Sequence, residues 1–419
     1  MSPVMTHAGT SRRPIRRRRG AAAVLTCALG LAAACGGGGG GSPASTAADP
    51  DAPVAAARPA DFTGTIDEFY EVPDPLPEGV PGELIRVMPV SDDATTVTVR
   101  VMYHSRDARN RDRAVTGIVT YPTAAAAPAG GWPVVAWAHG TTGLAAPCAP
   151  SRGGGPAPAF GVDGVRVATD YIGLGPVGER HPYLSGQSEA HSVIDAVRAA
   201  RLLPEAGAGT RWVAVGHSQG GHAALFAHEL GQAYAPELEP LGTAALAPAA
   251  VFEQRFGPAD QVVPHMVGAL GVYGLAAENP DIAVEDYISE EVAAADEVVD
   301  EGCLDEIVDA FIRIPIEDFY DRSPFETEPA LSVLRANDPG HAAVGAPLLL
   351  ASGTADTWVV PARVQALFDQ LCAAGQATEL VEVAGADHNV TPAMSDRVRA
   401  WFADRLAGVD PTDSCSGGG

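Results

Sequence analysis

Short apolar runs alternate with helical segments along most of this chain, and that alternation limits the fold more than any other feature. Strands are predicted at 133–140, 165–171, 212–218, 241–248, 347–356 and 379–385, and helices at 188–203, 220–234, 361–375 and 395–406. The runs are rich in β-branched residues and nearly continuous, which is typical of strands buried on both faces. The sequence therefore predicts an α/β fold with a mostly parallel central sheet flanked by helices. Earlier runs at 96–103 and 115–122 predict an antiparallel pair.

One long segment interrupts this alternation. Residues 249–346 are acidic and helical in pattern, and no apolar strand lies among them. We expect an inserted helical cap there, with an α/β core built from 61–248 and 347–419. The alternative is a set of extra helices packed on the flank of the sheet. The apolar stretch 265–276 predicts a buried cap helix, although such a stretch is also suited to lining an acyl tunnel.

The first residues are typical of an export signal. Arginines precede an apolar block at 20–34, which is shorter than the about 20 residues of a membrane span. Cys35 then follows small residues, as in a bacterial lipoprotein signal, although Leu31 lies one place earlier than the usual leucine. We therefore predict a signal peptide at 1–34, lipidation of Cys35 and a flexible tether at 35–60. The protein is expected at the cell surface or outside the cell.

Charge and cysteine content agree with this location. Six of the 27 arginines lie in the predicted signal peptide, so the rest of the chain has 21 arginines and 52 acidic residues. A protein with this negative charge should be repelled by nucleic acid. A membrane is expected to be a partner only through the lipid anchor, and the protein is expected to be a monomer. The four other cysteines of the mature chain predict two disulfides, in any of three pairings: Cys148, Cys303, Cys372 and Cys415.

A serine between glycines marks the candidate nucleophile. The motif Gly216-His217-Ser218-Gln219-Gly220 joins a predicted strand to a predicted helix, which is the setting of a nucleophile elbow. A side chain at Gly216 or Gly220 would collide with neighbouring backbone in so sharp a turn. The alternative is an ordinary glycine-rich turn, but the strand–helix context favours a catalytic Ser218.

A base and an acid are available in the order that this arrangement requires. Asp356 lies in a loop at the end of the apolar run within 347–356, and His388 follows the last predicted strand. Both would lie at the carboxyl ends of strands, as Ser218 does, where sites form in open α/β sheets. His341 is the weaker candidate base, and Asp387 is expected to be a solvated loop acid.

An oxyanion hole needs two donors. The backbone N–H of Gln219 should be one, and the loop after an earlier strand should supply the other, from Gly140, Thr141 or Thr142. His139, in the same loop, is expected to have a structural role. No metal or other cofactor is expected: His217, His222 and His228 lack the spacing of a metal motif and are expected to be packing or surface groups.

The segments that carry these residues resemble the secretory lipase family of fungi and actinobacteria, α/β-hydrolases similar to Candida antarctica lipase A. The resemblance rests on "VAWAHGTTGLAAPCAPS", "VATDYIGLGPVGERHPYL", "GHSQGGHAAL", "SGTADTWVV" and "GADHNV" and extends over about 69–406. It implies an α/β-hydrolase fold, a helical cap, and disulfides Cys148–Cys303 and Cys372–Cys415. In lipase A an acidic residue stands where this chain has Gly-Thr-Thr.

Together these features predict an exported serine hydrolase that cleaves carboxylic esters, a lipase or esterase acting on acylglycerols or other lipid esters. Two other functions are compatible with the same residues: acyl transfer to an alcohol, and non-catalytic lipid binding by a lipoprotein. Amide cleavage uses the same machinery, but nothing in the sequence requires it.

Overall fold

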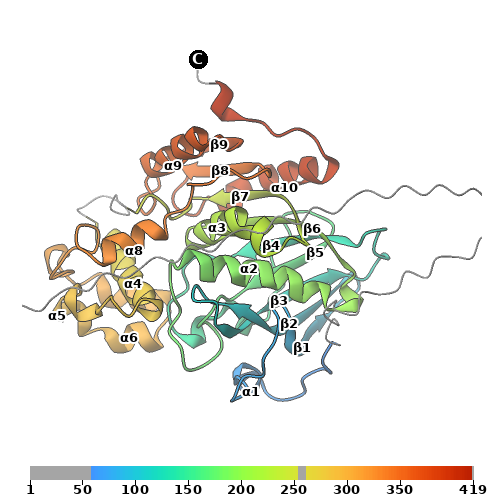
Figure 1. Ribbon diagram of the computed structural model, residues 1–419, viewed down its shortest axis with the longest axis horizontal. Coiled ribbons are helices and arrows are strands. Elements are labelled where there is room, and N and C mark those ends of the chain that lie inside the picture. Colours follow the sequence, from blue (N-terminus) through green and yellow to red (C-terminus); the bar gives the residue numbers. More distant parts are fainter. Residues whose placement is uncertain (1–57, 253–260, 418–419) are drawn as a thin grey trace, which may run out of the picture. The chain divides into compact units, whose positions relative to one another are not determined.

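The computed structural model describes residues 58–252 and 261–417. The predicted signal peptide, Cys35 and nearly all of the predicted tether lie outside the described residues. A nine-stranded sheet forms the centre, in the order β1-β2-β3-β5-β4-β6-β7-β8-β9 (Figure 1). Its strands are β1 (Leu84–Asp92), β2 (Thr96–Arg106), β3 (Asp112–Pro122), β4 (Trp132–Ala138), β5 (Val165–Thr169), β6 (Ala208–His217), β7 (Glu239–Leu246), β8 (Leu348–Gly353) and β9 (Thr378–Val383).

The antiparallel part is larger than the sequence predicts. β1, β2 and β3 pair antiparallel, and β3 joins β5 in the same sense. β1 was not predicted, because its exposed and buried positions do not alternate and a proline lies in its middle. Its pairing with β2 is irregular around Pro89, which fits the rule that proline is tolerated on an edge strand.

The parallel part extends from β5 to β9, with both faces covered by helices. Val134 and Ala136 of β4 pack in the cluster under α2, whereas Val135 between them packs with Trp401 and Phe402 of α10. Burial on both sides explains why these strands are continuous apolar runs. The helices on the sheet are α2 (Gly186–Arg201), α3 (Gln219–Tyr234), α9 (Pro361–Ala374) and α10 (Thr391–Ala407). This is the α/β-hydrolase fold that the sequence predicts.

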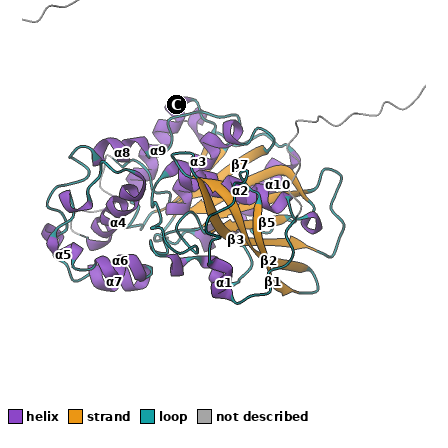
Figure 2. Cartoon of the chain, turned by 60° about the horizontal axis from the view of Figure 1, so that its bottom comes forward, coloured by secondary structure: helices purple, strands orange, loops and turns teal. Residues whose placement is uncertain are grey.

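The connection from β7 to β8 holds the remaining large group of helices. These helices, here called the insertion, lie together beside the sheet (Figure 2) and are α4 (Val262–Glu278), α5 (Glu290–Ala293), α6 (Asp296–Glu301), α7 (Leu304–Phe311) and α8 (Ala330–Ala336). They share an apolar cluster of their own, to which α4 contributes Met266, Leu270 and Tyr273. The stretch 265–276 is thus part of a buried helix. None of the described helices has the length and apolarity needed to cross a membrane.

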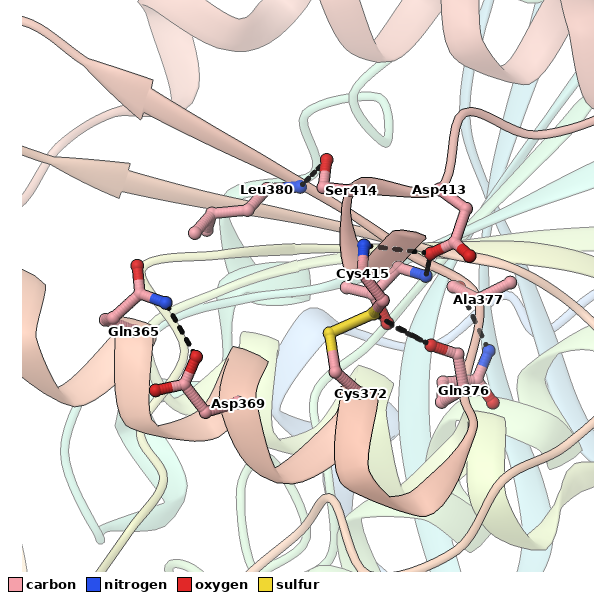
Figure 3. The surroundings of a disulfide bond; sticks show 10 residues. Gln365, Asp369, Cys372, Gln376, Ala377, Leu380, Asp413, Ser414 and Cys415 are labelled. Atoms are coloured by element: carbon pink, nitrogen blue, oxygen red, sulfur yellow. Dashed lines mark hydrogen bonds between the residues drawn. A yellow bond between two sulfur atoms is a disulfide. The ribbon is translucent and has the colours of Figure 1, made fainter. Parts of the chain in front are cut away.

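Two disulfides bring distant segments together, and they are the pairs that the family resemblance implies. Cys148–Cys303 joins the segment after β4 to the start of α7. Cys372–Cys415 joins α9 to the segment that follows α10, beside the edge strand β9 (Figure 3). There the backbone N–H of Leu380 donates to Ser414 Oγ at 3.3 Å, so the C-terminal segment covers part of an exposed sheet edge.

Between residue 58, where the described part of the chain begins, and β1 lies one short helix, α1 (Ile66–Tyr70). Thr65 caps it by accepting from the backbone N–H of Glu68, and the Glu68 carboxylate accepts from the backbone N–H of Thr65 in return. Phe69 and Tyr70 at its end are fully buried in the core cluster. The segment is therefore an integral part of the core.

Candidate active site

Ser218 lies on a sharp turn between β6 and α3. Its backbone has φ 57° and ψ −119°, a conformation that costs a non-glycine residue free energy and persists only where the surroundings fix it. The Ser218 N–H donates to the carbonyl of Leu246 on the neighbouring β7 at 3.0 Å, which anchors the turn. The serine stands immediately before the first residue of α3, at the positive end of the helix dipole.

Two glycines allow this turn to form. A Cβ built on Gly216 would lie 1.9 Å from the carbonyl oxygen of Gly220. A Cβ on Gly220 would lie 1.9 Å from the carbonyl oxygen of Ala138, at the end of β4. Both distances are far below van der Waals contact, and both collisions involve backbone atoms, which cannot swing away. Any side chain at Gly220 would push β4 and the loop after it away from Ser218.

Replacing Gly220 with alanine should therefore destabilise the protein. We expect the free energy of unfolding to fall by about 3 kcal/mol, as for strong overpacking of a core. Urea denaturation measures this. Gly345→Ala is the matched control, because a Cβ there meets nothing within 4 Å and its backbone angles are ordinary; its change should stay within about 0.5 kcal/mol. Equal stability of the two variants would contradict the close approach of Gly220 to the backbone of Ala138.

The structure brings Ser218, His388 and Asp356 into one hydrogen-bonded chain. The Ser218 hydroxyl lies 2.9 Å from His388 Nε2, and His388 Nδ1 lies 2.8 Å from Asp356 Oδ2. The serine follows β6, the aspartate follows β8 and the histidine follows β9. All three stand at the carboxyl ends of parallel strands, because successive parallel strands end at the same edge of the sheet.

Asp356 is held rigidly. Its carboxylate is almost fully buried, and Oδ1 accepts from the backbone N–H groups of Trp358 at 2.8 Å and Val359 at 3.0 Å. Oδ2 is thereby directed at His388. With Asp356 accepting from Nδ1, the proton of a neutral His388 resides on Nδ1, and Nε2 is free to accept the proton of the Ser218 hydroxyl.

Two rings that the sequence analysis did not single out for this purpose hold the His388 imidazole. The Trp358 ring stacks on it, with centroids 5.2 Å apart and planes 17° apart. The His217 ring packs against it at 4.8 Å, and His217 Nε2 lies 2.8 Å from the His388 carbonyl oxygen. Burial lowers the pKa of His217 to about 4, so it is neutral and donates from Nε2. The adjacency of His217 to Ser218 in sequence was the one available signal.

The loop 139–143 lies against Ser218. A Cβ built on Gly140 would be 3.6 Å from Cβ of Ser218, which places this residue beside the candidate oxyanion position. His139 Nδ1 donates to the Gly140 carbonyl at 2.7 Å, and Tyr171 OH donates to the His139 carbonyl at 3.0 Å. Burial lowers the pKa of His139, which keeps it neutral in this structural position.

The insertion fixes the far end of the same loop. The Thr142 carbonyl accepts from the backbone N–H of Leu304 at 2.9 Å, and Gly143 pairs with Cys303 in a short antiparallel bridge. The Thr141 hydroxyl lies 2.7 Å from Tyr183 OH. The conformation of the loop beside Ser218 therefore depends on contacts with the start of α7.

The described residues contain no group of three or more histidine, cysteine or acidic side chains placed to hold a metal ion. His217 faces His388, as described above. His222 and His228 are both buried. Sequence reasoning also missed a group of buried polar side chains near Ser218, which come from α2 and from the loop before it. The tertiary fold brings these side chains together, and no sequence motif indicates their contact.

The chain has the α/β-hydrolase fold, and comparison with solved structures supports this. The rice cell wall degrading esterase LipA from Xanthomonas oryzae superimposes with a TM-score of 0.67 at 19% identity, over 78% of this chain and 100% of that one. Candida antarctica lipase A in its closed state gives 0.67 at 16% identity, over 82% and 86%. A putative hydrolase from Legionella pneumophila gives 0.62 at 18%, over 76% and 91%.

The chain belongs to the secretory lipase family. The family's sequence model matches residues 162–414, which is more than half of the 419 residues and includes Ser218, Asp356 and His388. None of the curated proteins matches the chain. Membership of this family supports a carboxylic ester hydrolase activity and agrees with export from the cell.

Proposed function

We propose that the protein is a serine hydrolase of carboxylic esters, with Ser218 as nucleophile, His388 as general base and Asp356 as the acid that orients it. The observation that carries this proposal is the continuous hydrogen-bonded chain from Asp356 through His388 to Ser218. It joins residues far apart in sequence at one edge of the sheet. This is the arrangement that activates a serine hydroxyl.

In the first half of the reaction His388 Nε2 removes the hydroxyl proton as Ser218 Oγ attacks the ester carbonyl. The imidazolium that forms is stabilised by the Asp356 carboxylate and by the face of the Trp358 ring, which attracts a cation. His388 then protonates the departing alcohol. In the second half a water molecule, deprotonated by His388, attacks the acyl-enzyme and releases the acid.

The developing oxyanion needs two fixed donors. We assign one to the backbone N–H of Gln219, which lies at the start of α3 directly after the nucleophile. The second comes from Gly140, Thr141 or Thr142, and the contact of Gly140 with Ser218 supports this loop as its source.

The insertion is proposed to be the cap over this site, and lipid esters are the proposed substrates. Three observations support this. The insertion is tied to the loop 139–143 by the Leu304–Thr142 hydrogen bond and by a disulfide. Its helices carry a large apolar cluster. The similar structures are named as a lipase and as an esterase.

The mature protein is proposed to be exported and anchored through lipidated Cys35, as a monomer. Two disulfides fit an oxidising compartment outside the cytoplasm, and the family is one of secretory enzymes. Metabolic labelling with a fatty acid tests the anchor. A Cys35→Ser variant should lose the label and leave the membrane fraction, and a label that persists in this variant would disprove the assignment.

Hydrolysis of a series of 4-nitrophenyl esters, from acetate to palmitate, tests the proposed function. The purified, disulfide-bonded protein should release 4-nitrophenol without added metal. A preference for long acyl chains would identify a lipase, and a preference for short ones an esterase. Release of transesterified product in water with added alcohol would instead identify acyl transfer. A folded protein that cleaves no ester but retains bound lipid would contradict the proposal in favour of lipid binding.

A further inference from the structure

Glu189 is a fully buried carboxylate that the mechanism above does not use. It lies near the start of α2, which packs beside α3 (Figure 1). A buried carboxylate without partners is very costly, so its partners show what its position supports.

In the part of the chain that the structure describes, the hydrogen bonds of the Glu189 carboxylate come from the surroundings of Ser218. Oε1 accepts from the side-chain amide of Gln219 at 2.8 Å and from the backbone N–H of Leu184 at 3.1 Å. Oε2 lies 2.6 Å from His222 Nδ1. Gln219 and His222 are both in the first turn of α3, so Glu189 holds the helix that begins immediately after Ser218.

The side chain of Gln219 is clamped on two sides. The second proton of its amide points to His181 Nε2, 2.6 Å away. His181 is able to accept there, because its Nδ1 donates to the carbonyl of Ile172 at 2.7 Å and burial lowers its pKa to about 4, which keeps the ring neutral. Both protons of the Gln219 side-chain amide are therefore donated in hydrogen bonds, which fixes the orientation of the amide.

His222 connects the same carboxylate to the insertion. Its Nε2 lies 2.8 Å from the carbonyl oxygen of Asn337, the residue directly after α8. With a carboxylate oxygen facing one ring nitrogen and a carbonyl oxygen facing the other, His222 is placed to donate from both. Burial alone would lower the pKa of His222, but the charge and hydrogen bond of Glu189 outweigh burial and raise it. The raised pKa favours the protonated form of His222, whose positive charge compensates the Glu189 carboxylate within hydrogen-bonding distance.

We propose that Glu189 is a positioning residue of the oxyanion hole: through the side chain of Gln219 and through His222, it fixes the first turn of α3 so that the Gln219 backbone N–H faces the reacting carbonyl oxygen. This inference rests on the proposed function. Glu189 touches no reacting atom. Its contribution comes from pre-organising a donor that would otherwise have to be oriented during the reaction.

Glu189→Gln tests the proposal, because it keeps the shape but replaces one acceptor oxygen with a donor. Either Gln219 or His222 then faces an N–H group. Loss of a whole oxyanion donor costs about 10²–10³ in kcat, so a misplaced one should lower kcat for 4-nitrophenyl butyrate about 10- to 100-fold. KM should change less than about 2-fold, since the donor acts in the transition state.

Asp195→Asn is the matched control. Asp195 is also a fully buried acid on α2, but it is hydrogen-bonded to Ser105 and to Tyr234 at the other end of α3. It should cost comparable thermal stability and leave kcat unchanged. An equal fall of kcat in both variants would show a general packing effect and overturn the proposal, as would an unchanged kcat in folded Glu189→Gln.

A second variant covers the case in which Glu189→Gln does not fold. Gln219→Met keeps the backbone N–H and the shape of the side chain but removes the amide that Glu189 holds. It should lower kcat about 10-fold with KM little changed, and a kcat within about 2-fold of wild type would overturn the proposal. Inactivity of the wild-type protein itself would reject the proposed function and this inference together, whereas an active wild type with unaffected variants rejects the inference alone.

Discussion

Replacing Ser218 with alanine is expected to lower kcat for 4-nitrophenyl esters by about 10⁴-fold or more. The residual catalysis would come from substrate binding and the oxyanion hole. The cause of the fall in kcat is the loss of the hydroxyl oxygen that lies 2.9 Å from His388 Nε2 and that His388 is placed to activate. The free energy of unfolding should change little, because the substitution removes one small group and breaks its hydrogen bond to His388. Initial rates with thermal melting measure both quantities.

Ser332→Ala is the control for this variant, because Ser332 is exposed on α8 of the insertion. It should retain wild-type kcat. If Ser218→Ala also retains more than about a tenth of wild-type kcat, the acyl-enzyme mechanism at Ser218 is wrong, since a nucleophile's removal costs far more.

Asp356→Asn should lower kcat by about 10³–10⁴-fold while the protein remains folded. The asparagine amide would face His388 Nδ1 either with an N–H group, which forces the wrong tautomer, or with a neutral oxygen, which no longer stabilises the imidazolium. Both effects act on the transition state, so KM should change little. Steady-state kinetics on one ester separate kcat from KM.

Asp387→Asn provides the comparison, because Asp387 adjoins His388 in sequence but is exposed, and its carboxylate accepts only a local backbone N–H from Asn389. Its kcat should stay within about 2-fold of wild type, as for most surface substitutions. A larger loss in Asp387→Asn than in Asp356→Asn would mean that the acid had been assigned to the wrong residue.

The sheet and the three candidate catalytic residues were predictable for one physical reason. Strands buried on both faces are continuous apolar runs, and the ends of parallel strands meet at one edge. Ser218, Asp356 and His388 each follow such a run, so their meeting could be inferred without knowing any side-chain contact. The segment at β1 escaped prediction because an edge strand that is half exposed, with a proline inside, carries neither a continuous nor an alternating pattern.

The surroundings of the site could not be predicted in this way. Glu189 meets Gln219 and His222 only because α2 and α3 pack side by side, and α8 reaches His222 from the insertion. The ring of Trp358 lies on His388 because a loop after β8 folds back toward the loop after β9. These contacts join segments far apart in sequence, and no local pattern in the sequence indicates them.

The acidic part of the insertion shows a different limit. Its helical pattern predicted helices, but the structure divides the region into the short helices α5, α6 and α7. α7 begins at Leu304, immediately after Cys303, whose disulfide to Cys148 ties this point to the core. Periodicity indicated the element type, and tertiary constraints set where each helix ends.

Mass spectrometry of the protein after reaction with a fluorophosphonate ester tests most directly whether Ser218 is the activated nucleophile. The reagent phosphonylates a serine only where a base activates it and an oxyanion hole receives its oxygen. We expect one adduct, on Ser218, that is absent from Ser218→Ala and strongly slowed in His388→Gln, with activity lost in step with labelling. An adduct on another residue, or full ester hydrolysis by protein whose Ser218 carries the adduct, would contradict this assignment.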